Sequence, residues 1–80
     1  GITVNALCPG PVDTPMAQQV HTEATRRAYT RNIPLARFGT VVEIANAALF
    51  LASAEGSYVN GHALPVDGGF TSTAAIFEVG

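Results

Sequence analysis

The pattern of apolar and polar positions divides the chain into two short strands with helical stretches between them. Residues 1–8 are apolar on both sets of alternating positions, which is typical of a strand buried on both faces of a parallel sheet. A Pro-Gly-Pro turn at residues 9–11 ends this strand, because proline cannot donate to a strand ladder. A second strand is predicted over residues 62–66, before an Asp-Gly-Gly turn, and residues 70–80 form a tail without a clear period.

The stretch after the Pro-Gly-Pro turn has only a weak helical pattern. Between residues 16 and 32 the apolar positions form a narrow stripe that recurs every fourth residue: Met16, Val20, Ala24 and Ala28. Either Asp13 or Thr14 can cap this helix, with Pro15 at its first position. Because so narrow a stripe buries little surface, we expect residues 9–32 to form a ligand loop and a mobile lid.

A stronger helix is predicted over residues 40–53. Thr40 and Glu43 have the spacing of a capping box, in which each residue satisfies a backbone N–H of the other. The apolar residues that follow cover a broad face, and its alanines allow close packing on a sheet. We expect Arg37, just before this helix, to form an ion pair.

The order strand, helix, helix, strand predicts an α/β fold in which the two strands are parallel. A two-stranded parallel sheet is not stable alone, because parallel sheets need several strands with both faces covered. The chain is therefore expected to be incomplete as a domain and to form the last part of a doubly wound parallel sheet. Asn5, a polar residue on a buried strand, is interpreted as a structural amide that bridges neighbouring backbone segments.

Composition narrows the classes of function. Hydrophobic residues make up 48% of the chain and charged residues 12%, so much of the surface is suited to being covered. The net charge is −2, with four arginines and no lysine, which argues against nucleic-acid binding and against an anionic membrane surface. No apolar run is long enough to cross a bilayer. The single cysteine, Cys8, is interpreted as a buried small hydrophobe in a reducing compartment.

The polar side chains outside the Pro-Gly-Pro segment suggest no further site. His21, His62 and Cys8 do not have metal-ligand spacing, so no metal site is expected. His21 is interpreted as a solvated lid residue, and Arg26 with Arg27 as a solvated helix face.

Four features in this order resemble the C-terminal part of the short-chain dehydrogenase/reductase family. They are the stretches NALCPGPVDTPM (5–16), IPLARFGTVVEIANAALFLAS (33–53) and SYVNGHALPVDGG (57–69), and the spacing among them. The texture is similar to the 3-oxoacyl-carrier-protein reductase and sugar or alcohol dehydrogenase subgroups. The resemblance implies a Rossmann-type fold, of which this chain would be the last two strands, and an NAD- or NADP-dependent oxidoreductase that interconverts alcohol and ketone.

The resemblance also implies roles for individual residues. Pro9 and Gly10 would shape the nicotinamide pocket, the backbone of Val12 would bond the carboxamide, and the Thr14 hydroxyl would reach the carboxamide or a phosphate. Met16 would be either a lid residue that touches substrate or a filler of the core. Asn5 and Asp67 would be structural.

The catalytic residues of the family are not found in this sequence. The family uses a glycine-rich TGxxxGxG loop, a serine and a YxxxK pair, whereas Tyr29 is followed four residues later by Ile33 and Tyr58 by His62. We therefore expect these 80 residues to be inactive alone.

Other functions stay open at this stage. The chain could be a non-catalytic interaction or assembly module, or part of an enoyl reductase or epimerase of the same fold. By analogy with the family, we expect a cytoplasmic protein and a homo-oligomer, a tetramer or dimer, formed through the 41–53 helix and the 62–66 strand.

Overall fold

The computed structural model describes residues 1–72, and most of the expected tail, 70–80, lies outside the described residues. Two four-residue strands, β1 (Ala6–Pro9) and β2 (Ala63–Val66), pair in parallel, with Ala6 opposite Ala63 and Pro9 opposite Val66. The remaining elements lie between them in sequence: α1 (Pro15–Val20), α2 (Glu23–Arg31), α3 (Val41–Ala52) and the short 3-10 helix η1 (Ala54–Gly56).

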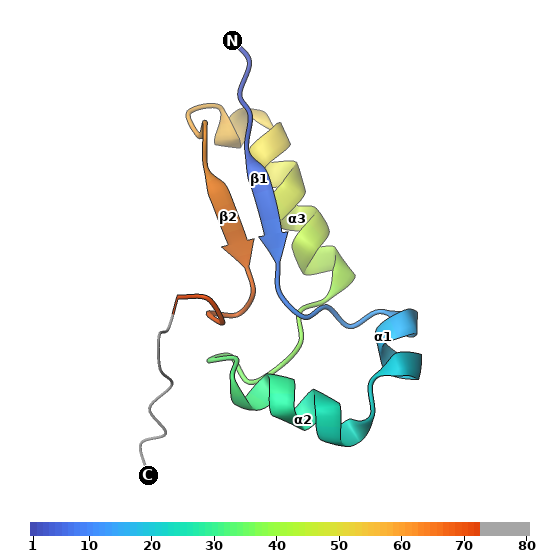
Figure 1. The fold of residues 1–80 in the computed structure, drawn as a ribbon. Helices are drawn as coiled ribbons and strands as arrows, with labels where there is room; N and C mark the ends of the chain where they lie inside the picture. The colour runs from blue at the N-terminus through green and yellow to red at the C-terminus, as the bar shows by residue number, and fades with distance from the viewer. Residues whose placement is uncertain (73–80) are drawn as a thin grey trace.

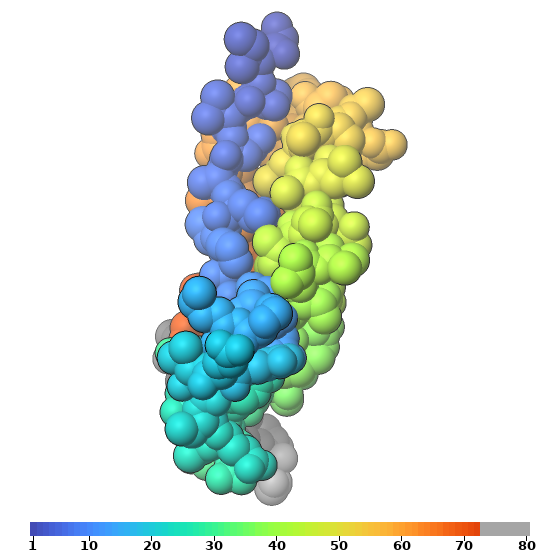
Figure 2. Space-filling view, turned by 90° about the vertical axis from the view of Figure 1, so that its right-hand side faces the viewer, coloured from blue at the N-terminus to red at the C-terminus, as the bar shows by residue number. Residues whose placement is uncertain are grey.

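The elements are arranged around the direction of the two strands. Helix α3 runs alongside β1, whereas α1 and α2 lie beyond the arrowheads of the strands (Figure 1). Figure 2 shows the two short helices gathered at one end of the molecule, below β1 and α3. The carboxyl ends of both strands therefore face the segment that the sequence predicts to be a loop and lid.

The first strand is shorter than the predicted residues 1–8. Only Ala6–Pro9 pair residue by residue with β2. The preceding residues are held by isolated contacts: the Val4 N–H donates to the Asn60 side chain at 2.9 Å, and the Gly61 N–H donates to the Val4 carbonyl at 2.8 Å. The partner segment bends at Asn60 and Gly61, where Gly61 has a positive φ of 74°, so a regular ladder begins only after it.

Asn5 has the structural role that the sequence predicts. Its Nδ2 donates to the Val59 carbonyl at 3.0 Å, and its Oδ1 accepts from the His62 N–H at 2.9 Å. The single side chain thus joins the start of β1 to both ends of the bend that precedes β2.

The predicted lid helix is two helices rather than one. The chain leaves the helical conformation at His21, and Thr22 then caps α2 by accepting from the Thr25 N–H at 3.2 Å. Threonine stabilises a new helix start more readily than it continues a helix, because its hydroxyl competes for backbone groups. The break lets α2 turn back toward the strand ends.

The capping box of α3 is confirmed. The Thr40 hydroxyl accepts from the Glu43 N–H at 3.1 Å, and the Glu43 carboxylate accepts from the Thr40 N–H at 2.9 Å. Arg37 forms the expected ion pair: its Nη1 donates to Glu43 Oε1 and its Nη2 donates to Glu43 Oε2, each at 2.8 Å. These contacts lower the pKa of Glu43 to about 2, the hydrogen bond from Arg37 being the largest cause.

Within the described residues the buried apolar side chains are Ile33 and Phe38, which lie in the connection between α2 and α3 and not on the strands. Cys8 is exposed, contrary to the sequence prediction, because α3 covers only the other face of β1, where Asn5 and Leu7 are half-buried. Ile2 is 88% exposed and Leu49 66%. None of the described helices is long and apolar enough to cross a membrane.

Replacing Asn5 by alanine is expected to destabilise the pairing of β1 with β2. The substitution removes one half-buried and one exposed hydrogen bond and takes a side-chain partner from two backbone groups, at a total cost of about 1–3 kcal/mol. The free energy of unfolding in urea, measured for the protein that carries this segment, reports the loss. Asn46→Ala on the exposed face of α3 is the control, and equal unfolding midpoints for the two variants would contradict this role of Asn5.

Glu43→Gln is expected to lower stability at neutral pH and to have no effect near pH 2. Glu43 has a folded-state pKa of about 2, below its ordinary value of 4.5, so its contribution is complete above that ordinary value. The contribution is lost as the pH falls toward 2. Urea unfolding of the wild type and the variant across this range tests the sign, and a difference that persists unchanged at the acidic end would refute it.

Glu23→Gln is the matched control, because the ion pair of Glu23 with Arg27 is long, at 3.7 Å, and exposed. At neutral pH the difference between this variant and the wild type should be smaller than that for Glu43→Gln, and it should change less as the pH falls.

Candidate functional site

The candidate site begins where β1 ends. Pro9 is the last residue of β1, and the Gly10 N–H donates to the Val66 carbonyl at 3.0 Å, so the pairing with β2 continues into the turn. A Cβ on Gly10 would lie 2.6 Å from the Cβ of Asp67 and 2.8 Å from its Cα. A side chain at this position would force the two strand ends apart, so the glycine is required by the contact with Asp67.

The turn after β2 supports this edge. The Asp67 carboxylate accepts from the N–H of Gly69 at 2.9 Å, from the N–H of Thr71 at 3.0 Å and from the Thr71 hydroxyl at 2.6 Å. The hydrogen bond from the Thr71 hydroxyl is the main cause that lowers the pKa of Asp67. Gly68 has a φ of 65°, in the left-handed region that favours glycine. Asp67 is thus structural, as expected, and the Asp-Gly-Gly segment is a tight turn.

Val12 lies in an isolated parallel bridge with Gly39. The hydrogen bonds of this bridge are made by the residues before and after Val12. The Gly39 N–H donates to the Pro11 carbonyl at 3.0 Å, and the Asp13 N–H donates to the Gly39 carbonyl at 2.8 Å. In extended backbone, the groups of successive residues point to opposite sides, so the N–H and C=O of Val12 point away from Gly39. Neither group has a hydrogen-bond partner among residues 1–72.

Thr14, and not Asp13, caps α1. Its hydroxyl oxygen accepts from the Ala17 N–H at 3.0 Å, and its backbone is extended, as the cap requires. A hydroxyl has one donor and two acceptor positions. Because the cap uses an acceptor position, the Thr14 O–H is still able to donate to an oxygen of a ligand.

Met16, the predicted substrate residue, is in the first turn of α1 and is 74% exposed. Met16 is not one of the two buried apolar residues of the described chain. The alternative that it fills the core is therefore not supported within residues 1–72. Pro9 thus ends β1, Gly10, Val12 and Thr14 follow in the loop that leaves it, and Met16 lies just beyond this loop in α1.

A cluster of side chains that the sequence pattern did not predict connects the lid to this loop. The His21 ring stacks on Tyr29 with centroids 5.5 Å apart, and both rings meet Phe38 edge-on at 6.2 and 6.1 Å. The Arg26 guanidinium lies 4.2 Å from the centre of the Phe38 ring. His21 and Arg26 are therefore half-buried and not solvated as predicted, whereas Val20 of the predicted stripe is 68% exposed.

Asp13 joins the same cluster from the loop. Its carboxylate is 3.3 Å from Arg26 Nη2 and accepts from Gln18 Nε2 at 3.3 Å. One carboxylate at the strand end thus contacts both lid helices, α1 through Gln18 and α2 through Arg26. The recurrence of charged and aromatic residues in 21–29 was the only sequence signal of this cluster, and it has no regular helical spacing.

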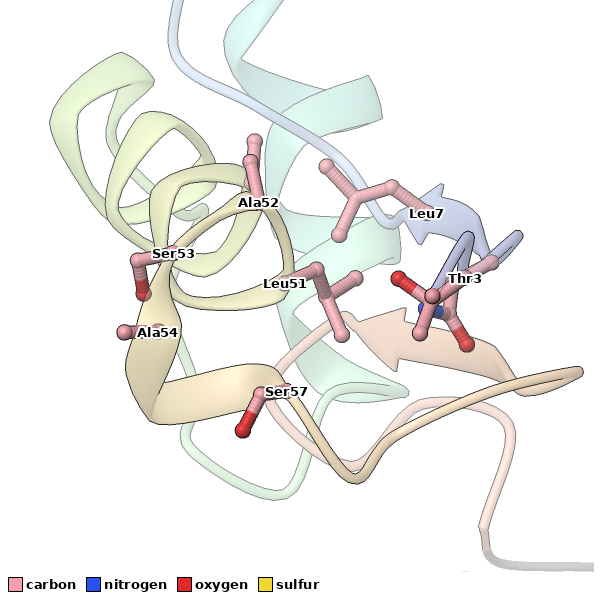
Figure 3. A pocket seen from close by; sticks show the side chains of 10 residues that line it. Thr3, Leu7, Leu51, Ala52, Ser53, Ala54 and Ser57 are labelled. Carbon is pink, nitrogen blue, oxygen red and sulfur yellow. The ribbon is translucent and has the colours of Figure 1, made fainter.

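A large, open hollow lies away from this loop. It has a volume of about 620 Å³ and lies between the start of the chain, the end of α3 and η1, with Thr3, Leu7, Leu51 and Ser57 on its walls (Figure 3). Among the residues of the described chain that line it, no side chain is ionisable (Figure 3). Within residues 1–72 no three of the residues His, Cys, Asp and Glu come together as a metal site would require.

Comparison with known proteins places this geometry in a family. A family model described as enoyl-(acyl carrier protein) reductase matches residues 1–71. The chain is 48% identical over 68 residues to the 3-oxoacyl-[acyl-carrier-protein] reductase FabG of Thermotoga maritima, which covers 85% of this chain and 27% of that protein.

Solved structures agree in fold. A gluconate 5-dehydrogenase from Burkholderia cenocepacia J2315, in complex with NADP and tartrate, matches with a TM-score of 0.80 and 42% identity, over 91% of this chain and 29% of that one. A mutant of a Serratia marcescens short-chain dehydrogenase/reductase matches with a TM-score of 0.76 and 36% identity, over 86% and 27%.

The chain therefore spans less than one third of the length of these relatives. The matches confirm the expected fold class, an α/β Rossmann-type fold of which these elements are one part. On the family match over residues 1–71 and the likeness in sequence and structure, the chain belongs to the short-chain dehydrogenase/reductase family.

Proposed function

We propose that this chain is the C-terminal segment of an NAD- or NADP-dependent oxidoreductase that interconverts an alcohol and a ketone. The segment supplies the nicotinamide side of the site and the lid, and the glycine-rich loop and the Ser, Tyr and Lys residues belong to the rest of the protein. The observation that carries the proposal is the loop Pro11–Thr14 at the carboxyl ends of parallel strands. Within residues 1–72 the Val12 N–H and C=O have no hydrogen-bond partner, and the Thr14 hydroxyl serves its helix cap as an acceptor, which leaves its O–H for a ligand. Ligands bind at such strand ends in open α/β sheets.

The groups of this loop fit a nicotinamide carboxamide. A carboxamide has an NH₂ that donates and an oxygen that accepts. The Val12 C=O and N–H supply one acceptor and one donor on the side away from Gly39, and the Thr14 O–H supplies a second donor. The cofactor, when bound, supplies the hydride chemistry. The part of this chain is to hold and orient the nicotinamide ring.

The lid completes the proposal. Helices α1 and α2 lie beyond the strand ends (Figure 1), which supports a contact between Met16, in the first turn of α1, and a substrate that enters above the nicotinamide. The substrate is a small alcohol or ketone. The solved gluconate 5-dehydrogenase with NADP, to which this chain is similar, supports both the cofactor and the substrate class.

The proposal includes assembly into a homo-oligomer in the cytoplasm. Helix α3 leaves Val42 65% and Leu49 66% exposed, and an apolar helix face of this kind is stabilised when it packs on a second copy. Strand β2 has one neighbour, β1, among the described residues, so its outer edge is open to further contacts.

Variants of Thr14 separate cofactor binding from helix capping. Thr14→Asp keeps an oxygen that caps α1 but has no hydrogen to donate, and its negative charge opposes a phosphate. In the intact protein we expect Thr14→Asp to weaken NAD(P)H binding about tenfold, measured by fluorescence titration, while its unfolding midpoint stays near that of the wild type.

Thr14→Ser keeps both functions and is the matched control. Thr14→Ala loses both, so it should lower stability as well as affinity. An intact wild-type protein that binds neither NAD nor NADP would overturn the proposed function. Wild-type affinity in Thr14→Asp would overturn the role of this hydroxyl.

The description of the matching family model favours one other reaction, the reduction of an enoyl thioester. Steady-state assays of the intact protein with a ketone and with an α,β-unsaturated thioester distinguish the two. We expect oxidation of the reduced cofactor with the ketone and none with the unsaturated thioester. The reverse result would assign the chain to an enoyl reductase.

A further inference from the structure

We propose that Arg26 is a positioning residue that holds the lid, α1 and α2, against the ligand loop Pro11–Thr14. Its two contacts, with Asp13 and with Phe38, form what we call the latch. The kinetic consequence of the latch rests on the proposed function, whereas its effect on the lid itself does not.

The contacts of Arg26 set it apart from its neighbours on α2. Its Nη2 lies 3.3 Å from Asp13 Oδ2, and its Cζ lies 4.2 Å from the centre of the Phe38 ring, with the side chain 30% exposed. A guanidinium plane on an aromatic face is attracted by the ring quadrupole, more strongly as water is removed. The side chain of Arg27, the next residue, is 69% exposed, and among the described residues its ion pair is with Glu23 of the same helix, at 3.7 Å.

Asp13 connects this contact to the ligand loop. It lies between the two residues proposed to bond the cofactor, Val12 and Thr14, and its own N–H donates to the Gly39 carbonyl at 2.8 Å. Its other carboxylate oxygen accepts from Gln18 of α1 at 3.3 Å. A displacement of α2 is therefore transmitted through the ion pair to Asp13, in the middle of the proposed cofactor-binding segment.

Phe38 connects the latch to the same place by a second route. It is 7% exposed and adjoins Gly39, whose backbone bonds both Pro11 and Asp13. The rings of His21 and Tyr29 pack on it from the lid. Both contacts of Arg26 thus converge on the bridge that sets the direction of the Val12 backbone.

The contacts of the latch are weak enough for the lid to open. Arg26 Nη1 and His21 Nδ1 are buried without a hydrogen-bond partner among the described residues, and both regain partners in water when the lid moves. Asp13 is 36% exposed, so its ion pair is partly screened by solvent. The closed lid is therefore only weakly favoured, as a lid that admits and releases substrate needs.

The test compares Arg26→Gln with Arg27→Gln in the intact protein. Hydrogen exchange of the amides of residues 23–31 reports lid opening, and we expect Arg26→Gln to exchange about three- to tenfold faster than the wild type. Arg27→Gln should exchange at the wild-type rate. Arg26→Lys keeps the charge but not the planar fork, so its rate should lie between those of the wild type and Arg26→Gln.

Two further measurements distinguish positioning from a structural role. Because Asp13 and Arg26 act as one unit, the double variant Asp13→Asn/Arg26→Gln should exchange no faster than Arg26→Gln alone. In steady-state kinetics Arg26→Gln should raise KM about three- to tenfold with kcat within about twofold of the wild type.

Each outcome supports or contradicts a specific part of the proposal. Equal exchange rates in the Arg26→Gln and Arg27→Gln variants would overturn the latch even if NAD(P) binds. Faster exchange with unchanged KM would overturn the positioning role. Faster exchange in an intact protein that binds no NAD(P) would support the latch and overturn the proposed function instead.

Discussion

Parallel pairing of β1 with β2 is the constraint on which the rest of the structure depends. Because the strands run in the same direction, their carboxyl ends reach one edge, and the two turns that follow share the space there. Gly10 and Asp67 meet at that edge with no room for a side chain on Gly10. The Asp67 carboxylate bonds its own turn, so the turn after β2 keeps its shape beside the loop that leaves β1. The edge of the sheet thereby determines where the ligand loop begins.

Gly39 provides the second support of that loop. Its carbonyl accepts from the Asp13 N–H and its N–H donates to the Pro11 carbonyl. These two hydrogen bonds, to the residues before and after Val12, hold the segment extended. An extended segment that bonds on one side presents the backbone groups of its central residue on the opposite side. The chain then enters α1 at Thr14, whose cap uses the hydroxyl as an acceptor. The donor and acceptor groups of the loop are thus oriented by its own folding, before a ligand is considered.

The features that the sequence predicted correctly rest on local chemistry or on a strict requirement. Thr40 and Glu43 have few alternatives to the capping box, because both partners lie within one turn. Asn5 bonds residues more than fifty positions away, yet it was predictable because a half-buried amide has to find partners. The burial of Cys8 was predicted wrongly, since a pattern typical of a strand covered on both faces does not say what covers it. The burial of His21 and Arg26 depends on the distant Phe38 ring, which no period in the lid sequence reveals.

The polar character of the lid follows from what a lid must do. Burying one large aliphatic side chain stabilises a contact by about 1.5–3 kcal/mol, and several such side chains would keep the lid shut. An arginine on a ring and a half-exposed ion pair each contribute about 1 kcal/mol or less, and the unpartnered atoms of His21 and Arg26 offset part of this. The weak alanine-rich stripe therefore does not show that the lid is badly packed. Two members of this stripe, Met16 and Val20, are exposed. A substrate under the lid can then supply the apolar contact that the free lid lacks.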